Sequence, residues 1–435
     1  MEQIVFHIDV NSAFLSWSAQ KRLSAGDLVD LRTIPSIVGG DMEKRHGVVL
    51  AKSIPAKKYG IQTGEPIVNA MRKCPNLVLE PPDHHLYRQR SHELMSYLAD
   101  ICPEIEQLSV DECFMDFTPV KNRYTSPEEA ARLIKDEIRE KLGFTVNIGI
   151  SDKKILAKMA SDFKKPDMVH TLYTHEIQEK MWPLPVSSLY MCGKSSVQAL
   201  YNLQIRTIGE LATADKQILA SHLKSHGITL WEYANGIDPS RVVSVPAEAK
   251  GIGNSTTLSK DVTSREEACK TLLLLAESVG TRLRKACQMA GMVSVEIKYS
   301  SFQSVSHQTT LYTPSASTQI IYETSCRLFD ELWNKSPIRL LGIRTSKLCD
   351  DTQPVQMSLF DLPQLQIPSA ASAFEPTFAA SDLTQTEAAP LNRPQRRPAK
   401  QKLEALDKSL DRIRQKYGED AVVRGSLLNE KLSKH

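Results

Sequence analysis

The sequence lacks several features that would place it in a specialised class of protein. Its eight cysteines include no C-x-x-C pair, which argues against a zinc site and is typical of a protein with reduced thiols. No apolar run approaches the roughly 20 residues that a membrane-spanning helix needs, and the start MEQIVFHIDVNSAF does not resemble a signal peptide. We therefore expect a cytoplasmic protein that makes no membrane contact.

Net charge is also low, at +3 over 435 residues. This argues against a protein that binds nucleic acid through a strongly basic tail. A local basic surface stays possible, because the distribution of charge matters more than its sum. The length favours two to four domains, and the hydrophobic fraction of 41% is sufficient for a sizeable core.

The N-terminal segment has the pattern of a central strand that ends at an acid. Residues 4–8 form a short apolar run typical of a buried strand, and Asp9 follows directly. Asn11 or Ser12 is then expected to cap a helix that begins near Ala13. An acid at the end of a buried strand is costly to bury without a partner, which makes Asp9 a candidate site residue.

A second pair of acids lies near a predicted hairpin turn. Residues 105–109 and 113–117 have the pattern of its two strands, which places Asp111 and Glu112 near the turn. Strands that alternate with helices but include a hairpin predict a mixed sheet, so the expected fold class is α+β.

The strongest predicted helix spans residues 126–142. Ser126 is its expected N-cap, Glu129 is expected to complete a capping box, and Gly143 suits the end of the helix. A strand is expected at 144–150.

The rest of the chain changes character several times. Residues 151–236 are mainly helical, with a glycine-containing turn at 192–196 that can direct backbone N–H groups at a phosphate. A smaller α/β unit follows at 251–347, in which basic residues outnumber acidic ones. Its expected elements are a helix at 264–289, strands at 293–299 and 305–311, and a helix at 320–332.

Residues 350–400 contain seven prolines among Ala, Ser, Thr and Gln, which predicts a disordered linker. A final amphipathic helix is expected from 402 to about 417, with Gly418 at its end.

The carboxylates allow two interpretations when only their spacing is considered. Transfer of a phosphoryl group requires charge neutralisation and alignment, commonly by two Mg²⁺ ions about 3.5–4 Å apart. Mg²⁺ prefers carboxylate oxygens, which Asp9, Asp111 and Glu112 would supply. The alternative is that each acid is an N-cap or a solvated turn residue.

Three separated motifs resemble those of the Y-family DNA polymerases, the DinB/UmuC superfamily. Residues 7–14, HIDVNSAF, are similar to the first motif, and residues 109–116, SVDECFMD, to the S-(I/V)-D-E-x-(F/Y)-x-D motif. GIS at 149–151, LAKMAS at 156–161 and KP at 165–166 are similar to the third. The motifs stand in the family's order, and the resemblance covers residues 1 to about 348.

The resemblance implies an error-prone, DNA-directed DNA polymerase that acts in translesion synthesis without proofreading. Asp9, Asp111, Glu112 and the Val10 carbonyl would bind two Mg²⁺ ions, and the substrates would be primer-template DNA and a dNTP. Three further residues would contact the nucleotide. These are Phe14, as the steric gate beneath the sugar, and Lys57 and Lys165, at the triphosphate.

The resemblance also implies a right-hand architecture with five parts. They are palm and fingers at 1–168, a helical thumb at 169–240, a little finger at 250–348, a linker at 350–400 and a C-terminal helix at 401–435. In the thumb, Gly193, Lys194 and Ser195 would contact DNA.

A short peptide at the start of the linker resembles the sequence with which bacterial enzymes bind the sliding clamp. It comprises Gln356, Met357, Ser358, Leu359 and Phe360. The basic, amphipathic C-terminal segment could bind a recombinase filament, an accessory subunit or DNA, or be a solvated helix.

Departures from the family pattern keep a second hypothesis open. Ile54 stands where many members have Tyr, Lys57 where they have Arg, and Asp152 where Asn is usual near Lys153. These changes are closer to the UmuC-like branch. They motivate the alternative of a clamp-tethered DNA-binding protein with little catalysis of its own. A DNA glycosylase is a third option, in which the Asp-Glu hairpin would have no role.

Overall fold

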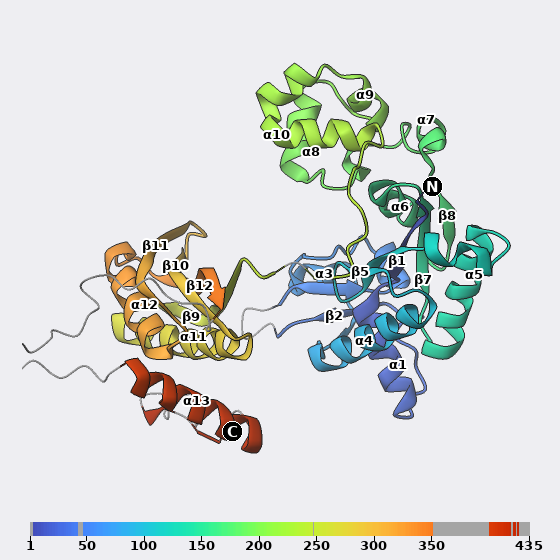
Figure 1. Cartoon of the computed structure of the whole chain (residues 1–435). Coiled ribbons are helices and arrows are strands. Elements are labelled where there is room, and N and C mark those ends of the chain that lie inside the picture. The colour runs from blue at the N-terminus through green and yellow to red at the C-terminus, as the bar shows by residue number, and fades with distance from the viewer. Residues whose placement is uncertain are drawn as a thin grey trace, which may run out of the picture. The chain divides into compact units, whose positions relative to one another are not determined.

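A computed structural model describes residues 3–41, 47–246, 248–350, 400–418, 421–422 and 424–425. The chain divides into two compact units, Met1–Ala247 and Glu248–His435 (Figure 1). Both contain helices and sheets, so the predicted α+β class is confirmed. The peptide at 356–360 and the predicted linker lie outside the described residues. Within the described ranges, no helix combines the length and apolarity that crossing a membrane requires.

The first unit is built on a five-stranded sheet with the order β5-β6-β1-β7-β8. Its strands are β1 (Val5–Val10), β5 (Ile105–Gln107), β6 (Glu112–Asp116), β7 (Val146–Ser151) and β8 (Val169–Thr171). Only β7 and β8 are parallel. The helices packed around this sheet are α1 (Ala13–Ser24), α4 (His84–Ile101), α5 (Pro127–Glu137) and α6 (Lys154–Ser161).

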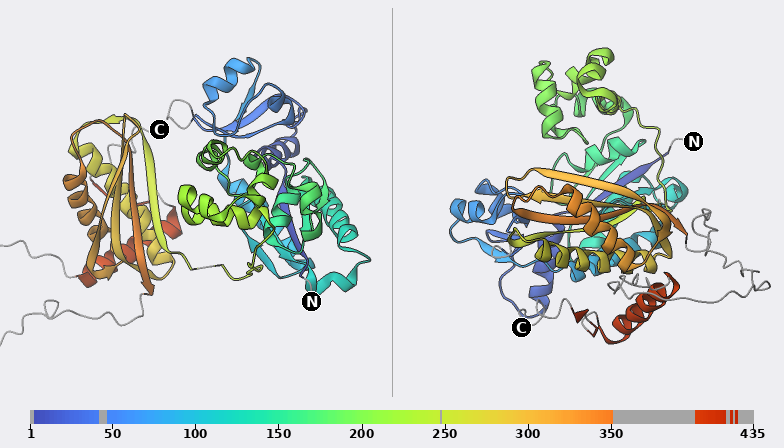
Figure 2. Two further views of the ribbon diagram at one scale, coloured as in Figure 1. Left: turned by 90° about the horizontal axis from the view of Figure 1, so that it is seen from above. Right: turned by 90° about the vertical axis from the view of Figure 1, so that its left-hand side faces the viewer.

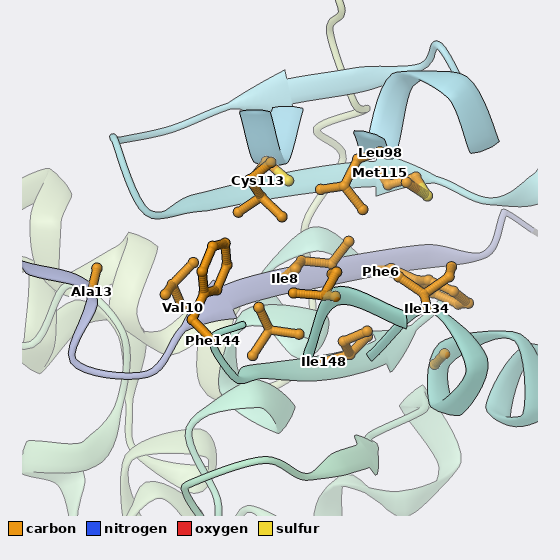
Figure 3. Packing of buried hydrophobic residues seen from close by; sticks show 14 of the residues in the cluster. Phe6, Ile8, Val10, Ala13, Leu98, Cys113, Met115, Ile134, Phe144 and Ile148 are labelled. Carbon is orange, nitrogen blue, oxygen red and sulfur yellow. The ribbon is translucent and has the colours of Figure 1, made fainter. Parts of the chain in front are cut away.

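Strand β1 lies in the middle of the sheet, and both of its faces are buried. Phe6, Ile8 and Val10 point into the main core, where they pack between side chains of β6 and β7 (Figure 3). His7 is fully buried on the opposite face, which α6 covers. This double burial explains the nearly continuous apolar run in the sequence.

Glycine at position 149 lets α6 lie against β7. A Cβ added to Gly149 would come within 2.0 Å of the Ala157 carbonyl oxygen, so any side chain there would push the helix away. This close approach brings Lys158 of α6 next to the ends of β1 and β6.

A small three-stranded sheet and a helical segment complete the first unit. The sheet has the order β3-β2-β4, formed by β2 (Ser36–Gly39), β3 (Val49–Lys52) and β4 (Val78–Glu80). Helices α2 (Ile54–Lys58) and α3 (Ile67–Lys73) accompany it. The helical segment contains α7 (Ile177–Lys180), α8 (Lys194–Asn202), α9 (Ile208–Thr213) and α10 (Lys216–Ala234).

Two helix predictions in the first unit need correction in detail. Ser12 precedes α1 in the left-handed region, at φ 48° and ψ 52°, and its side chain makes no capping hydrogen bond. Asn11 instead donates from Nδ2 to Thr145 Oγ1 at 3.2 Å. Ser126 caps α5 as expected, but the Glu129 carboxylate accepts from Thr125 N, so no capping box closes there.

The second unit is a four-stranded antiparallel sheet, in the order β11-β10-β12-β9, with two helices on one face (Figure 2). Its elements are β9 (Gly251–Val262), α11 (Arg265–Lys285), β10 (Gln288–Tyr299), β11 (Ser304–Ser315), α12 (Thr318–Leu332) and β12 (Ile338–Asp350). The prediction that the first helix reaches residue 289 is wrong. The chain leaves α11 after Lys285, and Gln288 already pairs with Asp350 in the sheet.

The C-terminal helix α13 (Lys400–Tyr417) is docked on the second unit through its polar face. The Asp407 carboxylate, 3% exposed, accepts from the backbone N of Thr318 at 2.9 Å and so caps α12 in place of Ser317. Arg284 of α11 donates to Asp411 at 2.5 and 3.0 Å. One face of this helix therefore belongs to the fold of the unit.

Replacing Asp407 by Ala should lower the stability of the second unit by about 2 kcal/mol. Helix α12 loses its cap, and Arg284 loses the Asp407 carboxylate, which lies 3.5 Å from its Nη1. Thermal unfolding, followed by circular dichroism and by tryptophan fluorescence, measures the change. Lys408→Ala, one residue further and exposed, is the control. Equal melting curves for the two variants would show that the docking does not stabilise the unit.

Candidate active site

The register of two neighbouring strands brings the three predicted acids together. Asp9 of β1 lies directly opposite Glu112 of β6, so their Cβ atoms are about 5 Å apart. Asp111 precedes β6, and its carbonyl oxygen accepts from Val10 N at 2.9 Å. All three acids and the Val10 backbone thus meet at one end of β1.

Two lysines balance the charge of these carboxylates. Lys158 Nζ forms an ion pair with Glu112 and lies 3.8 Å from Asp9 Oδ2. Lys165 Nζ lies 2.7 Å from the same Asp9 oxygen. Across the described residues, no three His, Cys, Asp or Glu side chains are arranged to hold a metal ion. The carboxylate oxygens are those that a hard cation prefers, and here they face ammonium groups.

Neighbouring acids in the site have opposite pKa shifts. Burial raises the pKa of Asp111, and the negative charges of Asp9 and Glu112 raise it further, against a hydrogen bond from Ser109. Close contacts with His7 and Lys158 lower the pKa of Glu112 to about 2, although burial opposes them. The cluster thus contains acids whose pKa values are shifted in opposite directions, as is common at functional sites.

A buried histidine lies next to Glu112. His7 Nε2 lies 3.2 Å from Glu112 Oε2, and its Nδ1 lies 2.8 Å from Ser161 Oγ. Burial lowers the pKa of His7. Neither His7 nor Lys158 was assigned a role from the sequence, although both stand inside the quoted motifs. Since His7 is two residues before Asp9, the alternation of a strand would have placed it on the same face.

The loop that carries Lys165 is anchored from β7. Asn147, which pairs with Asp9 across the strands, donates from Nδ2 to the carbonyl oxygens of Ser161 and Lys164 at 3.0 and 2.7 Å. Lys165 also contacts Asp162 at 2.8 Å. Burial alone would lower the pKa of Lys165, but the charges of Asp9 and Asp162 raise it.

Phe14 lies in the first turn of α1, just after β1. Its ring is stacked on Tyr87 of α4, with centroids 4.4 Å apart and planes 8° apart, and it meets His84 edge-on. The ring is partly buried against the main core. These aromatic contacts fix the orientation of the ring.

The remaining predicted residues lie on other elements. Lys57 is exposed on α2 and, among the described residues, forms no ion pair with the acids. Burial lowers the pKa of its neighbour Lys52, and the charge of Lys57 adds to that effect. Gly193 is the exposed N-cap of α8, where Lys194 and Ser195 are also exposed.

Comparison with known proteins identifies related sequences over nearly the whole chain. Residues 8–162 match the impB/mucB/samB family, and residues 249–359 match the C-terminal domain of the same family. The chain is 46% identical to a DNA polymerase IV of Clostridium acetobutylicum over 430 residues, which is 99% of each chain. It is 36% identical to a DNA polymerase IV 1 of Bacillus subtilis over 366 residues, covering 82% of this chain and 85% of that one.

A solved structure has the same fold. A Y-family DNA polymerase chimera, Dbh-Dpo4(243-245)-Dbh, superposes with a TM-score of 0.69 at 20% sequence identity. The match covers 80% of this chain and 99% of the other.

Removing the charge of Asp111 should stabilise the protein in the absence of metal. At neutral pH the ionised carboxyl, whose pKa is raised by folding, opposes folding. Asp111→Asn should therefore raise the free energy of unfolding by roughly 0.5–2 kcal/mol, in the range of other stabilising substitutions. Asn keeps an Oδ1 acceptor for Ser109.

The gain should disappear at low pH. It is full above the raised folded-state pKa of Asp111, and it vanishes once pH falls below the unfolded-state value of about 4, where Asp is protonated in both states. Urea unfolding in chelator at several pH values measures this dependence. The exposed Asp100→Asn is the control, and a gain that persists at pH 3 would contradict the electrostatic explanation.

Proposed function

We propose that this chain, which belongs to the impB/mucB/samB family of Y-family DNA polymerases, is an error-prone polymerase that copies damaged template DNA. The chain is a DNA-directed DNA polymerase, as its full-length relatives are. The observation that supports the proposed site is the convergence of Asp9, Asp111 and Glu112 at the end of two paired strands.

The carboxylates fit a pair of Mg²⁺ ions by their chemistry. Asp9, Asp111, Glu112 and the backbone carbonyl of Val10 would hold them, because Mg²⁺ prefers hard oxygen ligands. When bound, the ions would lower the pKa of the primer 3′-hydroxyl and neutralise the triphosphate and the leaving pyrophosphate. The protein's own part includes keeping Glu112 ionised, since His7 and Lys158 lower its pKa.

The lysines around the site suit the polyanionic substrate. Lys165 pairs with Asp9 in the free protein, and a cation at Asp9 would release the ammonium group for the triphosphate of the dNTP. Lys57 would be a second contact to the triphosphate. Its charge, next to that of Lys52, favours an anion nearby.

Phe14 is proposed as the gate that excludes ribonucleotides. Its ring follows the catalytic strand directly and is fixed by stacking on Tyr87. A fixed ring beneath the sugar would leave no space for a 2′-hydroxyl.

DNA would be held by the other parts of the chain. In this proposal the palm and fingers are residues 1–168, the thumb 169–240 and the little finger 250–348. Gly193, Lys194 and Ser195, exposed at the start of α8, would direct backbone N–H groups at a DNA phosphate. Such contacts position the duplex without reading its sequence.

A clamp-binding peptide at 356–360 would tether the enzyme to DNA. Leu359 and Phe360 would occupy an apolar pocket of a bacterial sliding clamp, with Gln356 bonded at its rim. Tethering raises the effective concentration of the enzyme at the primer end.

Primer extension with the purified protein tests the proposal. With Mg²⁺ and dNTPs, we expect extension on an undamaged template and past an abasic site, and stimulation by clamp that is lost in Phe360→Ala. Asp9→Ala should lower the extension rate on the order of a thousandfold or more, because charge stabilisation is lost. DNA binding measured in chelator should be unchanged.

Asp100→Ala, which removes an exposed acid far along α4, should extend primers like the wild type. Full activity of a folded Asp9→Ala variant would refute the site assignment. Tight DNA binding without extension under any condition would favour the alternative of a non-catalytic or partner-dependent accessory protein.

Phe14→Ala should weaken the selection against ribonucleotides by roughly 10- to 100-fold, since the clash with the 2′-hydroxyl disappears. The ratio of kcat/KM for dNTP and for rNTP incorporation measures this selection. Phe14→Tyr keeps the ring and should retain it. Unchanged selection in a folded Phe14→Ala protein would place the gate elsewhere.

A further inference from the structure

Two cysteines face each other across the helices of the second unit. Cys269 lies on α11 and is buried, whereas Cys326 lies on α12 and is partly exposed. The Cys326 thiol donates a weak hydrogen bond to Cys269 Sγ at 3.5 Å. A disulfide bond is about 2.0 Å long, so the sulfurs need to approach by only roughly 1.5 Å.

The helices hold this pair in a defined place. They run antiparallel, since Arg265 at the start of α11 donates to Asp330 near the end of α12, at 2.6 Å from both Nε and Nη2. At their other end, Arg284 of α11 bonds to Thr318 at the start of α12. The cysteines therefore lie between two cross-links of the same helix pair.

A groove gives small molecules access to the thiols. It has a volume of about 560 Å³, and its lining includes both cysteines together with Arg265, Tyr322 and Asp330. Helix α13 bonds to the opposite end of the helix pair, through Arg284 and Thr318. Cys326 is the more exposed of the two residues, so we expect a reagent in the groove to meet it first.

Groups around Cys326 shift the pKa of its thiol in both directions. Burial and the neighbouring Cys269 raise its pKa to about 12, which keeps the thiol protonated and slow to react at neutral pH. The Tyr322 hydroxyl and the Arg265 guanidinium act in the opposite direction, because they stabilise the thiolate. The other charged groups lining the groove are Glu323, Arg327, Asp330 and Glu331.

We propose that Cys269 and Cys326 are a redox modification site, at which a peroxide forms a disulfide between α11 and α12. Cys326 gives up its proton and attacks the peroxide, which yields a sulfenic acid and releases water. Cys269 Sγ then displaces the hydroxyl group from the Cys326 sulfur, and its own proton leaves with that group as a second water. In sum, two thiols and one hydrogen peroxide give one disulfide and two waters.

The disulfide would join residues 269 and 326 into a closed loop. This would reduce the conformational freedom of the second unit when it is unfolded. The carboxylate site lies in the first unit. The proposal therefore stands whether or not the proposed function is right.

The full chain, reduced and then treated with hydrogen peroxide, tests the site directly. After remaining thiols are blocked by alkylation, peptide mass spectrometry should find the Cys269 and Cys326 peptides joined, two hydrogen masses lighter than their sum. Dithiothreitol should restore both thiols. Survival of both thiols while the exposed Cys287 is oxidised would overturn the proposal, as would a different pairing.

Single variants test the order of the two steps. Cys269→Ser should stop the reaction at a sulfenic acid on Cys326, which dimedone labels, whereas Cys326→Ser should leave Cys269 unlabelled. Cys287→Ser is the matched control and should form the disulfide normally. Dimedone on Cys269 alone would reverse the assigned roles and contradict this reaction order.

The wild-type protein gives a readout that needs no variant. Oxidation should raise the unfolding temperature of the second unit by roughly several degrees, and reduction should reverse it. An oxidised protein that carries the cross-link but melts at a lower temperature would show that the bond distorts the helices, against the geometry proposed here.

Discussion

The pairing of β1 with β6 is the constraint on which the site depends. Its register sets Asp9 opposite Glu112 and lets Val10 N bond to the Asp111 carbonyl. A slip of one residue would turn Asp9 into the apolar core and bring Ile8 to the site face, because side chains alternate along a strand. Burial of Phe6 and Ile8 therefore enforces the register on which the proposed site depends.

Charge balance is the second constraint on the same site. Three acids at the end of paired strands repel one another, and Lys158 and Lys165 offset that repulsion in the free protein. Burial, together with the charges of Asp9 and Glu112, raises the pKa of Asp111, so its ionised form is costly in the folded protein. If the cluster acts as proposed, its cost in stability is the relation often found at active sites.

Polar contacts dock the C-terminal helix on the second unit. Asp407 and Asp411 reach α11 and α12 from a helix more than fifty residues beyond β12 in the sequence, counted from Asp350 to Asp407. The helix docks through these acids, while Leu406 and Tyr417 stay exposed. A pattern of apolar residues identifies a helix, but here it does not identify the face that packs.

The sequence by itself determined the α+β class, the hairpin at Asp111 and Glu112, and the family, because these depend on local periodicity and on motifs that stand in order. Only the tertiary structure decided which side chains surround the acids. Lys158 reaches Glu112 because α6 lies close over Gly149, and the two cysteines meet because α11 and α12 pack side by side. Such contacts join residues that are far apart in the chain. The periodic pattern of a segment predicts its secondary structure, but not how close it lies to another segment in the folded protein.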